Sequence, residues 1–245
     1  MAEPTLYDDF YRAAEGSVSK DIAALHGEDL ASCSAPGAWW NGEERRTLAS
    51  LARAARCDAK LQVATGDEHA STASLPEGVR RLVTELAVRP EQLDRAAIDG
   101  AQGDGVSDAA CVEVVGLVSR VVNHDVFARG LGISSRPLAP PVAGEPRRTR
   151  PATAIAEGGF LPSIPSGRRG GDEGRALYGD GMQPFIYRAL SLVPDEARRN
   201  MALGDAQYLP IDRFFDFGYS HHPALRRAQV EVIAGRVSAL NECFY

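Results

Sequence analysis

The C-terminal residues of the chain place a cysteine where its thiol could be activated. Asn241 is a favourable N-cap residue and Glu242 suits a first helical turn, so the sequence predicts that a new helix begins there. Cys243 would then lie at a helix N-terminus, where the helix dipole and free amide groups lower the pKa of a thiol. Glu231 stands twelve residues earlier on a preceding helix. A fold-back between the two helices would bring its carboxylate near the thiol as a proton acceptor.

Both residues also have a purely structural interpretation. A cysteine without catalytic neighbours is more often a buried small apolar residue than a nucleophile. Glu231 follows Arg227 by four residues, which is the spacing of an ion pair on a helix surface. The residues alone therefore leave open whether Cys243 and Glu231 form a reactive pair or make two unrelated contacts.

Other candidate residues point to structure rather than to chemistry. Glu113 lies on a similar helix, but Asp125 stands where a cysteine would be needed, so we expect Glu113 to be solvated or paired with an arginine. His221 and His222 precede a proline in a turn, and no partner lies at zinc-like spacing, so no metal site is predicted. The glycine-rich segment 167–171 lacks the lysine ending of a phosphate-binding loop and is read as a solvated loop.

Aromatic residues gather in two places, Trp39-Trp40 and the segment 214–219. We expect these side chains to belong to a core or an interface, and the alternative is that they line a hydrophobic substrate pocket. Cys111 falls in an apolar helix and is expected to be buried.

The composition excludes several classes of protein. The 245 residues carry a net charge of −6, which gives no electrostatic support for binding nucleic acid or an anionic membrane. Four cysteines in this length do not form a disulfide scaffold. No apolar run approaches the ~18 residues of a membrane span, and residues 1–10 lack the pattern of a secretory leader. These features favour a soluble cytoplasmic protein.

The periodicity of apolar residues predicts an all-α fold. The segments with helical spacing are 44–56, 79–86, 107–121 and 225–240. Ser107 and Asp108 are suitable N-caps for the third of these, and no segment alternates as a strand does.

Composition divides the chain into four parts. Residues 1–38 form a helical lead-in and residues 39–133 a first helical unit. Residues 134–184 hold eight of the 15 prolines and nine of the 24 glycines, so they are predicted to form an extended connector. Residues 185–245 form a second unit. The similarity between the segments 112–115 and 230–233 indicates that the two units are related.

The spacing at the C-terminus resembles a known motif. Glu231, eleven further residues and then Cys243, which lies within Asn-Glu-Cys-Phe-Tyr at 241–245, are similar to the motif of the alkyl hydroperoxidase D and carboxymuconolactone decarboxylase-like superfamily. In its peroxidase branch the motif is glutamate, eleven residues, Cys-x-x-Cys, three residues and histidine, and this sequence stops one residue before the second cysteine. The resemblance implies that Cys243 is the resolving thiol and Glu231 the carboxylate of the proton relay, and it implies a duplicated all-α fold.

Weaker similarity to the same superfamily extends to the segments 39–46, 107–116 and 188–194. The first unit departs from the motif around Cys57. Arg45 replaces the glutamate, Lys60 replaces the second cysteine and Ala64 replaces the histidine. No chemistry is therefore expected at Cys57, and the first unit is interpreted as a structural copy.

The resemblance implies a thiol- or selenol-dependent peroxidase, an antioxidant activity, in the complete protein. A residue after Tyr245 attacks the peroxide, Cys243 resolves the oxidised form, and an external dithiol or protein thiol reduces the product. Some similar proteins place selenocysteine at the attacking position, so a UGA codon read as a stop is one explanation of the ending. The alternatives are a nonsense mutation, an artificially shortened chain and a natural pseudoenzyme. The printed chain is expected to be inactive, and the implied reaction requires neither metal nor cofactor.

Two other functions remain open. One is a non-redox reaction of the carboxymuconolactone decarboxylase type, which does not depend on Cys243. The other is a non-catalytic helical binding or assembly protein. Members of the superfamily associate through helical faces, so a homo-oligomer is expected in each case.

Overall fold

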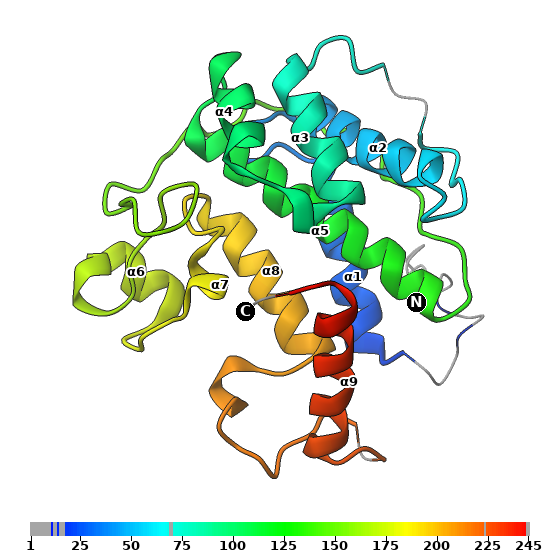
Figure 1. Ribbon diagram of the computed structural model, residues 1–245, viewed down its shortest axis with the longest axis vertical. Helices are drawn as coiled ribbons and strands as arrows, with labels where there is room; N and C mark the ends of the chain where they lie inside the picture. Colours follow the sequence, from blue (N-terminus) through cyan, green and yellow to red (C-terminus); the bar gives the residue numbers. More distant parts are fainter. Residues whose placement is uncertain (1–10, 12–13, 15–17, 69–70, 223, 244–245) are drawn as a thin grey trace, which may run out of the picture. The chain divides into compact units, whose positions relative to one another are not determined.

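The computed structural model describes residues 11, 14, 18–68, 71–222 and 224–243 (Figure 1). Within this part of the chain the all-α prediction is confirmed, because the one β-type pairing there is an isolated bridge between Ile155 and Ser163. Short 3-10 helices occur at η2 (Pro90–Gln92), η3 (Gly167–Gly170) and η4 (Ile211–Arg213). The α-helices are α1 (Lys20–Ser32), α2 (Gly42–Asp58), α3 (Glu77–Val88), α4 (Arg95–Gly103), α5 (Asp108–Gly130), α6 (Gly171–Tyr178), α7 (Phe185–Arg188), α8 (Pro194–Gln207) and α9 (Arg227–Leu240).

Side-chain caps fix where α2 and α5 begin. The Asn41 side chain accepts the Glu44 N–H at 2.9 Å, and the Glu44 carboxylate accepts the Asn41 N–H at 2.8 Å, which forms a capping box. Ser107 caps α5 by accepting the Ala110 N–H at 3.1 Å, as the sequence predicts. The helix predicted to end at residue 121 continues to Gly130, because the polar residues of its last part are held in buried contacts with α1 and α2.

The chain forms two compact units, Met1–Asn200 and Met201–Tyr245. In the first unit α2, α3 and α5 pack against one another around buried residues such as Leu48, Leu82 and Leu117 (Figure 1). Cys111 belongs to this cluster and is fully buried, as expected. A second apolar cluster forms around Ile164 and uses other residues of α5. The helix α5 is therefore apolar on two sides and lies at the centre of its unit.

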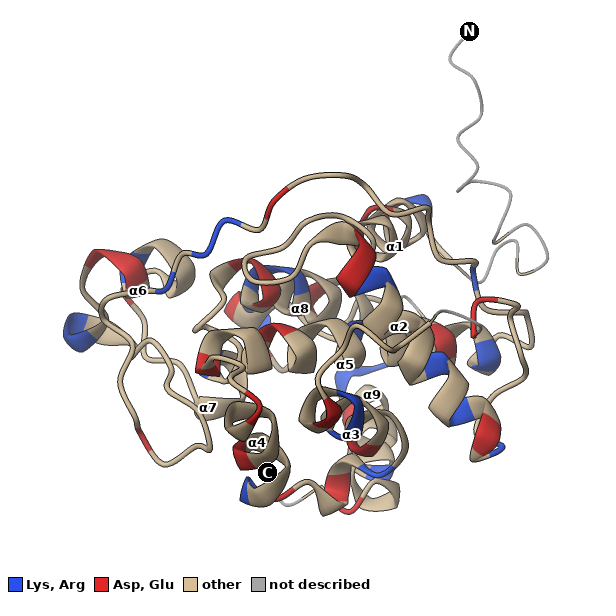
Figure 2. Cartoon of the chain, turned by 90° about the horizontal axis from the view of Figure 1, so that it is seen from above, with Lys and Arg blue, Asp and Glu red and all other residues tan. Residues whose placement is uncertain are grey.

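The connector predicted at 134–184 has no helix before η3 and one short α-helix, α6. The boundary between the compact units falls inside α8, so the duplicated arrangement of units 39–133 and 185–245 stays a prediction. Figure 2 shows acidic and basic residues interspersed along the helices. Among the described residues no helix is long and apolar enough to cross a membrane.

A close contact between α3 and α4 depends on the absence of a side chain at Gly78. A Cβ there would lie 2.5 Å from the carbonyl carbon of Gly100 and 2.6 Å from the backbone nitrogen of Ala101. We expect Gly78→Ala to lower the free energy of unfolding by about 1–3 kcal/mol, because the two helix backbones must move apart.

Gly100 is the matched control, because it lies on the other helix of the same contact. A Cβ at Gly100 meets no atom within 4 Å, so Gly100→Ala should raise the free energy of unfolding by about 0.5–1 kcal/mol. Urea-induced unfolding of both variants measures the difference. Equal effects of the two substitutions would contradict the close approach at Gly78.

Candidate functional site

Cys243 lies in a turn that ends α9. The Cys243 N–H donates to the Ser238 carbonyl at 3.0 Å and the Glu242 N–H donates to the Ala239 carbonyl at 3.4 Å, which is the Schellman arrangement. Glu242 has a φ of +51°, the left-handed conformation that reverses the chain at such a turn. Asn241 is the C-cap of α9, so the prediction that it caps a new helix is wrong. Asparagine suits both helix ends, and here the last carbonyls of α9 take the following amide groups.

The side chain of Cys243 is exposed and forms no disulfide. The helix that was predicted to activate it would include residues 244 and 245, which lie outside the described residues. The described residues therefore supply an accessible thiol directly after a reversal of the chain.

Glu231 lies near the start of α9 and is held by two neighbours. The Tyr208 hydroxyl donates to its carboxylate at 2.7 Å, and the Arg227 guanidinium donates to its other oxygen. Tyr208 and then Arg227 lower the pKa of Glu231, so the carboxylate is ionised at neutral pH. The predicted ion pair with Arg227 is confirmed.

Glu231 and Cys243 are not in contact among the described residues. The part of α9 from residue 231 to residue 240 is about 14 Å long at the usual rise per residue, and Cys243 follows its end. The described residues therefore do not bring the Glu231 carboxylate and the Cys243 thiol together.

A cavity of about 310 Å³ lies beside Glu231 in the second unit. Tyr208 and Arg227, which hold Glu231, both line it, together with apolar residues of α9 such as Val230 and Ile233. His221 also lines it. Its Nε2 donates to the Asp205 carbonyl at 2.7 Å and its Nδ1 accepts from the Tyr219 hydroxyl at 3.1 Å, so the neutral tautomer satisfies both contacts.

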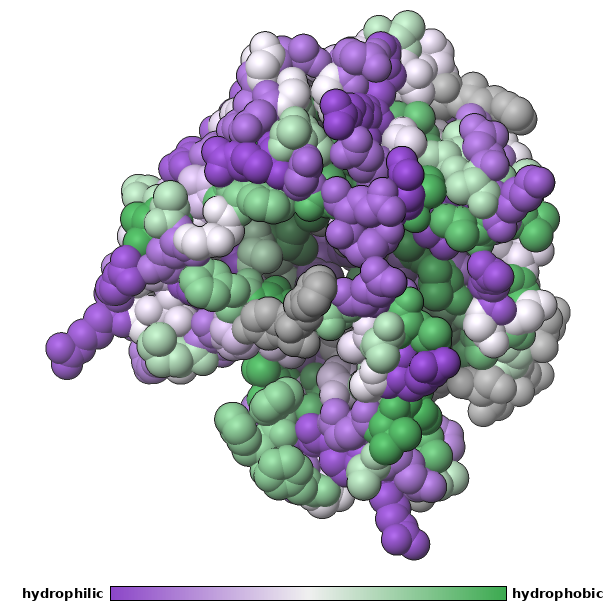
Figure 3. Space-filling view, viewed as in Figure 1, coloured by the Kyte–Doolittle hydropathy of each residue, from purple (hydrophilic) through white to green (hydrophobic). Residues whose placement is uncertain are grey.

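The phenylalanines of the segment 214–219 differ from the prediction. Phe214, Phe215 and Phe217 are exposed, the last two by 82% and 76%, so they do not lie in a core, and their expected place in an interface stays a prediction. Tyr219 lines the cavity beside Glu231. Figure 3 shows hydrophobic residues at the surface where this segment lies in Figure 1. Trp40, in contrast, is buried in the first core, as expected.

In the first unit, residues at the same twelve-residue spacing take part in ion pairs. Arg45 and Cys57 on α2, like Glu113 and Asp125 on α5, are twelve residues apart, as Glu231 and Cys243 are. Arg45 donates to the buried carboxylate of Glu113, which confirms the arginine-paired interpretation of Glu113. Arg53 donates to both oxygens of Asp125, at 3.0 and 2.8 Å.

The thiol of Cys57 lies 3.7 Å from the Glu68 carboxylate. Burial and the negative charge of Glu68 raise the pKa of Cys57, so the thiol is protonated at neutral pH. This environment disfavours a nucleophile at Cys57, which agrees with the expectation from the missing motif residues.

A buried charge network joins α1, α2, α5 and the start of α8. The Glu196 carboxylate accepts Arg45 at 3.0 Å through one oxygen and Arg120 at 2.7 Å through the other. Arg120 also donates to Asp29 at 2.7 Å, and the other Asp29 oxygen contacts His124 Nε2 at 2.8 Å. Burial alone would raise the pKa of Glu196, but Arg120 and Arg45 outweigh it and lower that pKa. These charges are paired within the core, so the network is a structural element.

Two glycines leave room for this network. A Cβ at Gly116 would lie 2.7 Å from the Glu196 Oε2, and one at Gly37 would overlap the Glu113 carboxylate. The sequence gives no local signal for the network, because its members are far apart along the chain. Tyr208, the hydroxyl donor to Glu231, was also missed, since it precedes α9 by many residues.

Among the described residues, no group of three or more histidine, cysteine, aspartate or glutamate residues is arranged to hold a metal ion. A comparison of the chain with models of protein families, with curated proteins and with solved structures found no match. The described residues therefore form an all-α protein with three notable features. These are the exposed thiol of Cys243, the ionised carboxylate of Glu231 beside a cavity, and the buried charge network around Glu196.

Proposed function

We propose that the complete protein is a thiol- or selenol-dependent peroxidase in which Cys243 is the resolving thiol. The observation that carries this proposal is the exposed Cys243 directly after a chain reversal, at the motif spacing from the ionised Glu231. The reversal supports a fold-back of the following residues along α9. The thiols of such a cycle must be re-reduced, which suits a cytoplasmic setting.

The proposed cycle balances with an external reductant. A thiolate or selenolate after Tyr245 attacks the terminal oxygen of a hydroperoxide, ROOH, and releases the alcohol ROH, which leaves a sulfenic or selenenic acid. The Cys243 thiol condenses with this acid, forms the S–S or S–Se bond and releases water. An external dithiol then reduces that bond by exchange. Glu231 would accept the proton of the attacking thiol or selenol as the thiolate or selenolate forms and return it to the leaving alkoxide, and Tyr208 links its carboxylate to the neighbouring cavity.

The experiment is to read the native gene past the codon for Tyr245 and to express the complete frame. We expect a cysteine or selenocysteine as the next residue and dithiol-dependent consumption of an organic hydroperoxide. Cys243→Ser should abolish multiple turnover, whereas Cys57→Ser should retain it, because the Cys57 thiol is protonated and lies in the first unit.

The printed 245-residue chain provides a second check. It should consume no more peroxide than an equal concentration of simple thiol. A stop codon other than UGA with no continuing frame, or robust turnover by the printed chain that depends on Cys243, would overturn the proposal.

An assembly function is favoured by one separate observation. The second unit exposes Phe215 and Phe217, together with Ile233 and Leu240 of α9, by more than half of each side chain. Apolar groups of this size are typical of surfaces that pair with another molecule. Cys243→Ser would leave such a function unchanged, as it would a non-redox decarboxylase-like reaction, so the same variant separates these functions from the peroxidase.

A further inference from the structure

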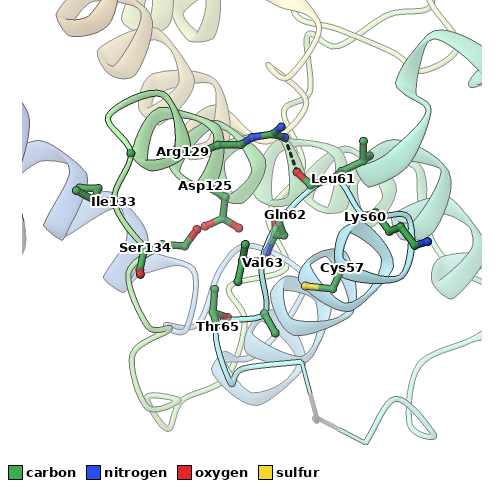
Figure 4. Close-up of a pocket in the computed structure, with 13 residues that line it drawn as sticks. Cys57, Lys60, Leu61, Gln62, Val63, Thr65, Asp125, Arg129, Ile133 and Ser134 are labelled. Carbon is green, nitrogen blue, oxygen red and sulfur yellow. Dashed lines mark hydrogen bonds between the residues drawn. The ribbon is translucent and has the colours of Figure 1, made fainter.

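A second cavity, of about 560 Å³, lies in the first unit between the C-terminal ends of α2 and α5 (Figure 4). The chain that follows each helix completes it, with residues 61–65 on one side and 132–135 on the other. Its volume is within the range of small-molecule sites. Leu61, Val63 and Ile133 supply apolar walls, and the Val63 side chain is 86% exposed.

The carboxylates near this cavity are already satisfied. Asp125 lines it but receives two hydrogen bonds from the buried guanidinium of Arg53. The Glu68 carboxylate, which lies beside Cys57, receives the backbone N–H groups of Thr65 at 2.6 Å and Gly66 at 2.8 Å. A cation would therefore find no carboxylate without a partner here.

Positive charge remains on the guanidinium of Arg129. Its Nη1 donates to the Leu61 carbonyl at 2.7 Å, which fixes the side chain along one wall (Figure 4). That is its one hydrogen bond within the described part of the chain, so other N–H groups of the fork are available to an acceptor. The Lys60 side chain adds positive charge at the rim and points away from the sulfur of Cys57. In the wall, the buried Nε2 of Gln62 has no acceptor among the described residues.

We propose that this cavity binds a small organic carboxylate. The carboxylate faces Arg129, and the apolar body of the ligand lies against Leu61, Val63 and Ile133. An arginine matches a carboxylate through two parallel N–H groups, and the rest of the cavity offers apolar surface and hydroxyl groups. This site is independent of the proposed peroxidase chemistry, because it lies wholly in the first unit.

Cys57 provides a reporter, because its half-buried thiol lines the cavity. The probe is benzoate, with the uncharged benzamide as its counterpart of the same shape. Alkylation of each cysteine by iodoacetamide at mildly alkaline pH is followed by peptide mass spectrometry. Benzoate at millimolar concentration should slow alkylation of Cys57 about threefold or more and leave the exposed Cys243 unchanged, whereas benzamide should protect weakly.

Substitution of Arg129 tests whether its guanidinium binds the carboxylate of the ligand. Arg129→Gln should raise the benzoate concentration needed for protection about tenfold. Arg95→Gln is the matched control, because Arg95 is also exposed and donates to a backbone carbonyl, that of Phe160, but does not line the cavity. In the Arg95→Gln variant, benzoate should protect Cys57 from alkylation as it does in the unchanged chain.

Three results would overturn the proposal. These are absence of protection by benzoate, equal protection by benzamide, and unchanged protection in Arg129→Gln. Protection by inorganic phosphate at the same concentration as benzoate would show that an anion alone suffices and would overturn the assignment to an organic carboxylate. The comparison of benzoate with benzamide needs no variant, so it tests the charge even if Arg129→Gln does not fold.

Discussion

Glu196→Gln is expected to lower the free energy of unfolding by about 3–5 kcal/mol, the largest loss that we predict for a single substitution. The Glu196 side chain is 3% exposed and is the shared acceptor of Arg45 and Arg120, which are equally buried. A neutral amide keeps the shape of the side chain but removes the charge between two buried guanidinium groups. Its NH2 group also faces those donors, so one buried contact becomes repulsive.

Asp195→Asn is the matched control for this prediction, because Asp195 is the preceding residue of the same helix. Its carboxylate is 42% exposed and pairs with the exposed Arg147 and Arg198. An exposed pair of this kind contributes less than about 1 kcal/mol. Urea titrations at one pH compare the two variants. Losses of similar size at positions 195 and 196 would show that burial of the network has no special importance for stability.

Local signals were sufficient to predict α2, α3 and α5 of the first unit. Asn41 and Glu44 form their capping box within four residues, and Ser107 caps α5 by a contact over three residues. Such contacts depend only on nearby sequence and survive in most tertiary settings. The predicted end of α5 was too early because His124 and Asp125 are polar, yet both are buried in contacts with other helices.

The candidate sites were less predictable, because they depend on distant contacts. Arg45 meets Glu113 across 68 positions and Glu196 across 151. The periodicity of the sequence does not indicate contacts between residues so far apart, and an arginine on a helix is usually interpreted as solvated. At the C-terminus the sequence predicted that Asn241 begins a helix, whereas Asn241 is the residue that ends α9. The Arg227–Glu231 pair, which spans only four residues, was predicted correctly.

In the first unit the twelve-residue spacing occurs twice without a glutamate–cysteine pair. Cys57 and Asp125 follow Arg45 and Glu113 by the same twelve positions, and both line the cavity of about 560 Å³. Arg45 and Glu113 form an ion pair, and the thiol of Cys57 is protonated at neutral pH. These contacts stabilise α2 against α5, which supports a structural role for the helices and leaves the cavity at their ends free to bind a ligand.

Stability is expected to fall by about 2 kcal/mol when the pH is lowered from 7 to 5, because His26 is buried in its neutral form. The pKa of His26 is lowered to about 3, by burial first and then by the neighbouring His124 and Arg136, against the opposing effect of Asp29. The Tyr11 hydroxyl contacts Nδ1 at 2.6 Å, and the imidazole is fully buried.

The direction of this pH dependence follows from the proton uptake of His26 in the unfolded and folded chains. The unfolded chain takes up a proton at His26 near its ordinary pKa of 6.5, whereas the folded chain does not until about pH 3, so each pH unit in this window favours unfolding by about 1.4 kcal/mol. Asp29 and Glu196, whose folded-state pKa values are lowered, add their losses only nearer pH 4, when the unfolded carboxylates take up protons. Burial raises the pKa of Glu113, which gives a partial gain in the opposite direction.

Urea unfolding at pH 7, 6 and 5 measures this dependence, and His26→Gln provides the comparison. Glutamine can still contact the Tyr11 hydroxyl but does not titrate, so the fall between pH 7 and 5 should be largely absent in the variant even if its stability at pH 7 is lower. A variant that loses as much stability as the unchanged chain over this range would assign the dependence to another group. Constant stability of the unchanged chain from pH 7 to 5 would mean that His26 takes up its proton equally in both states.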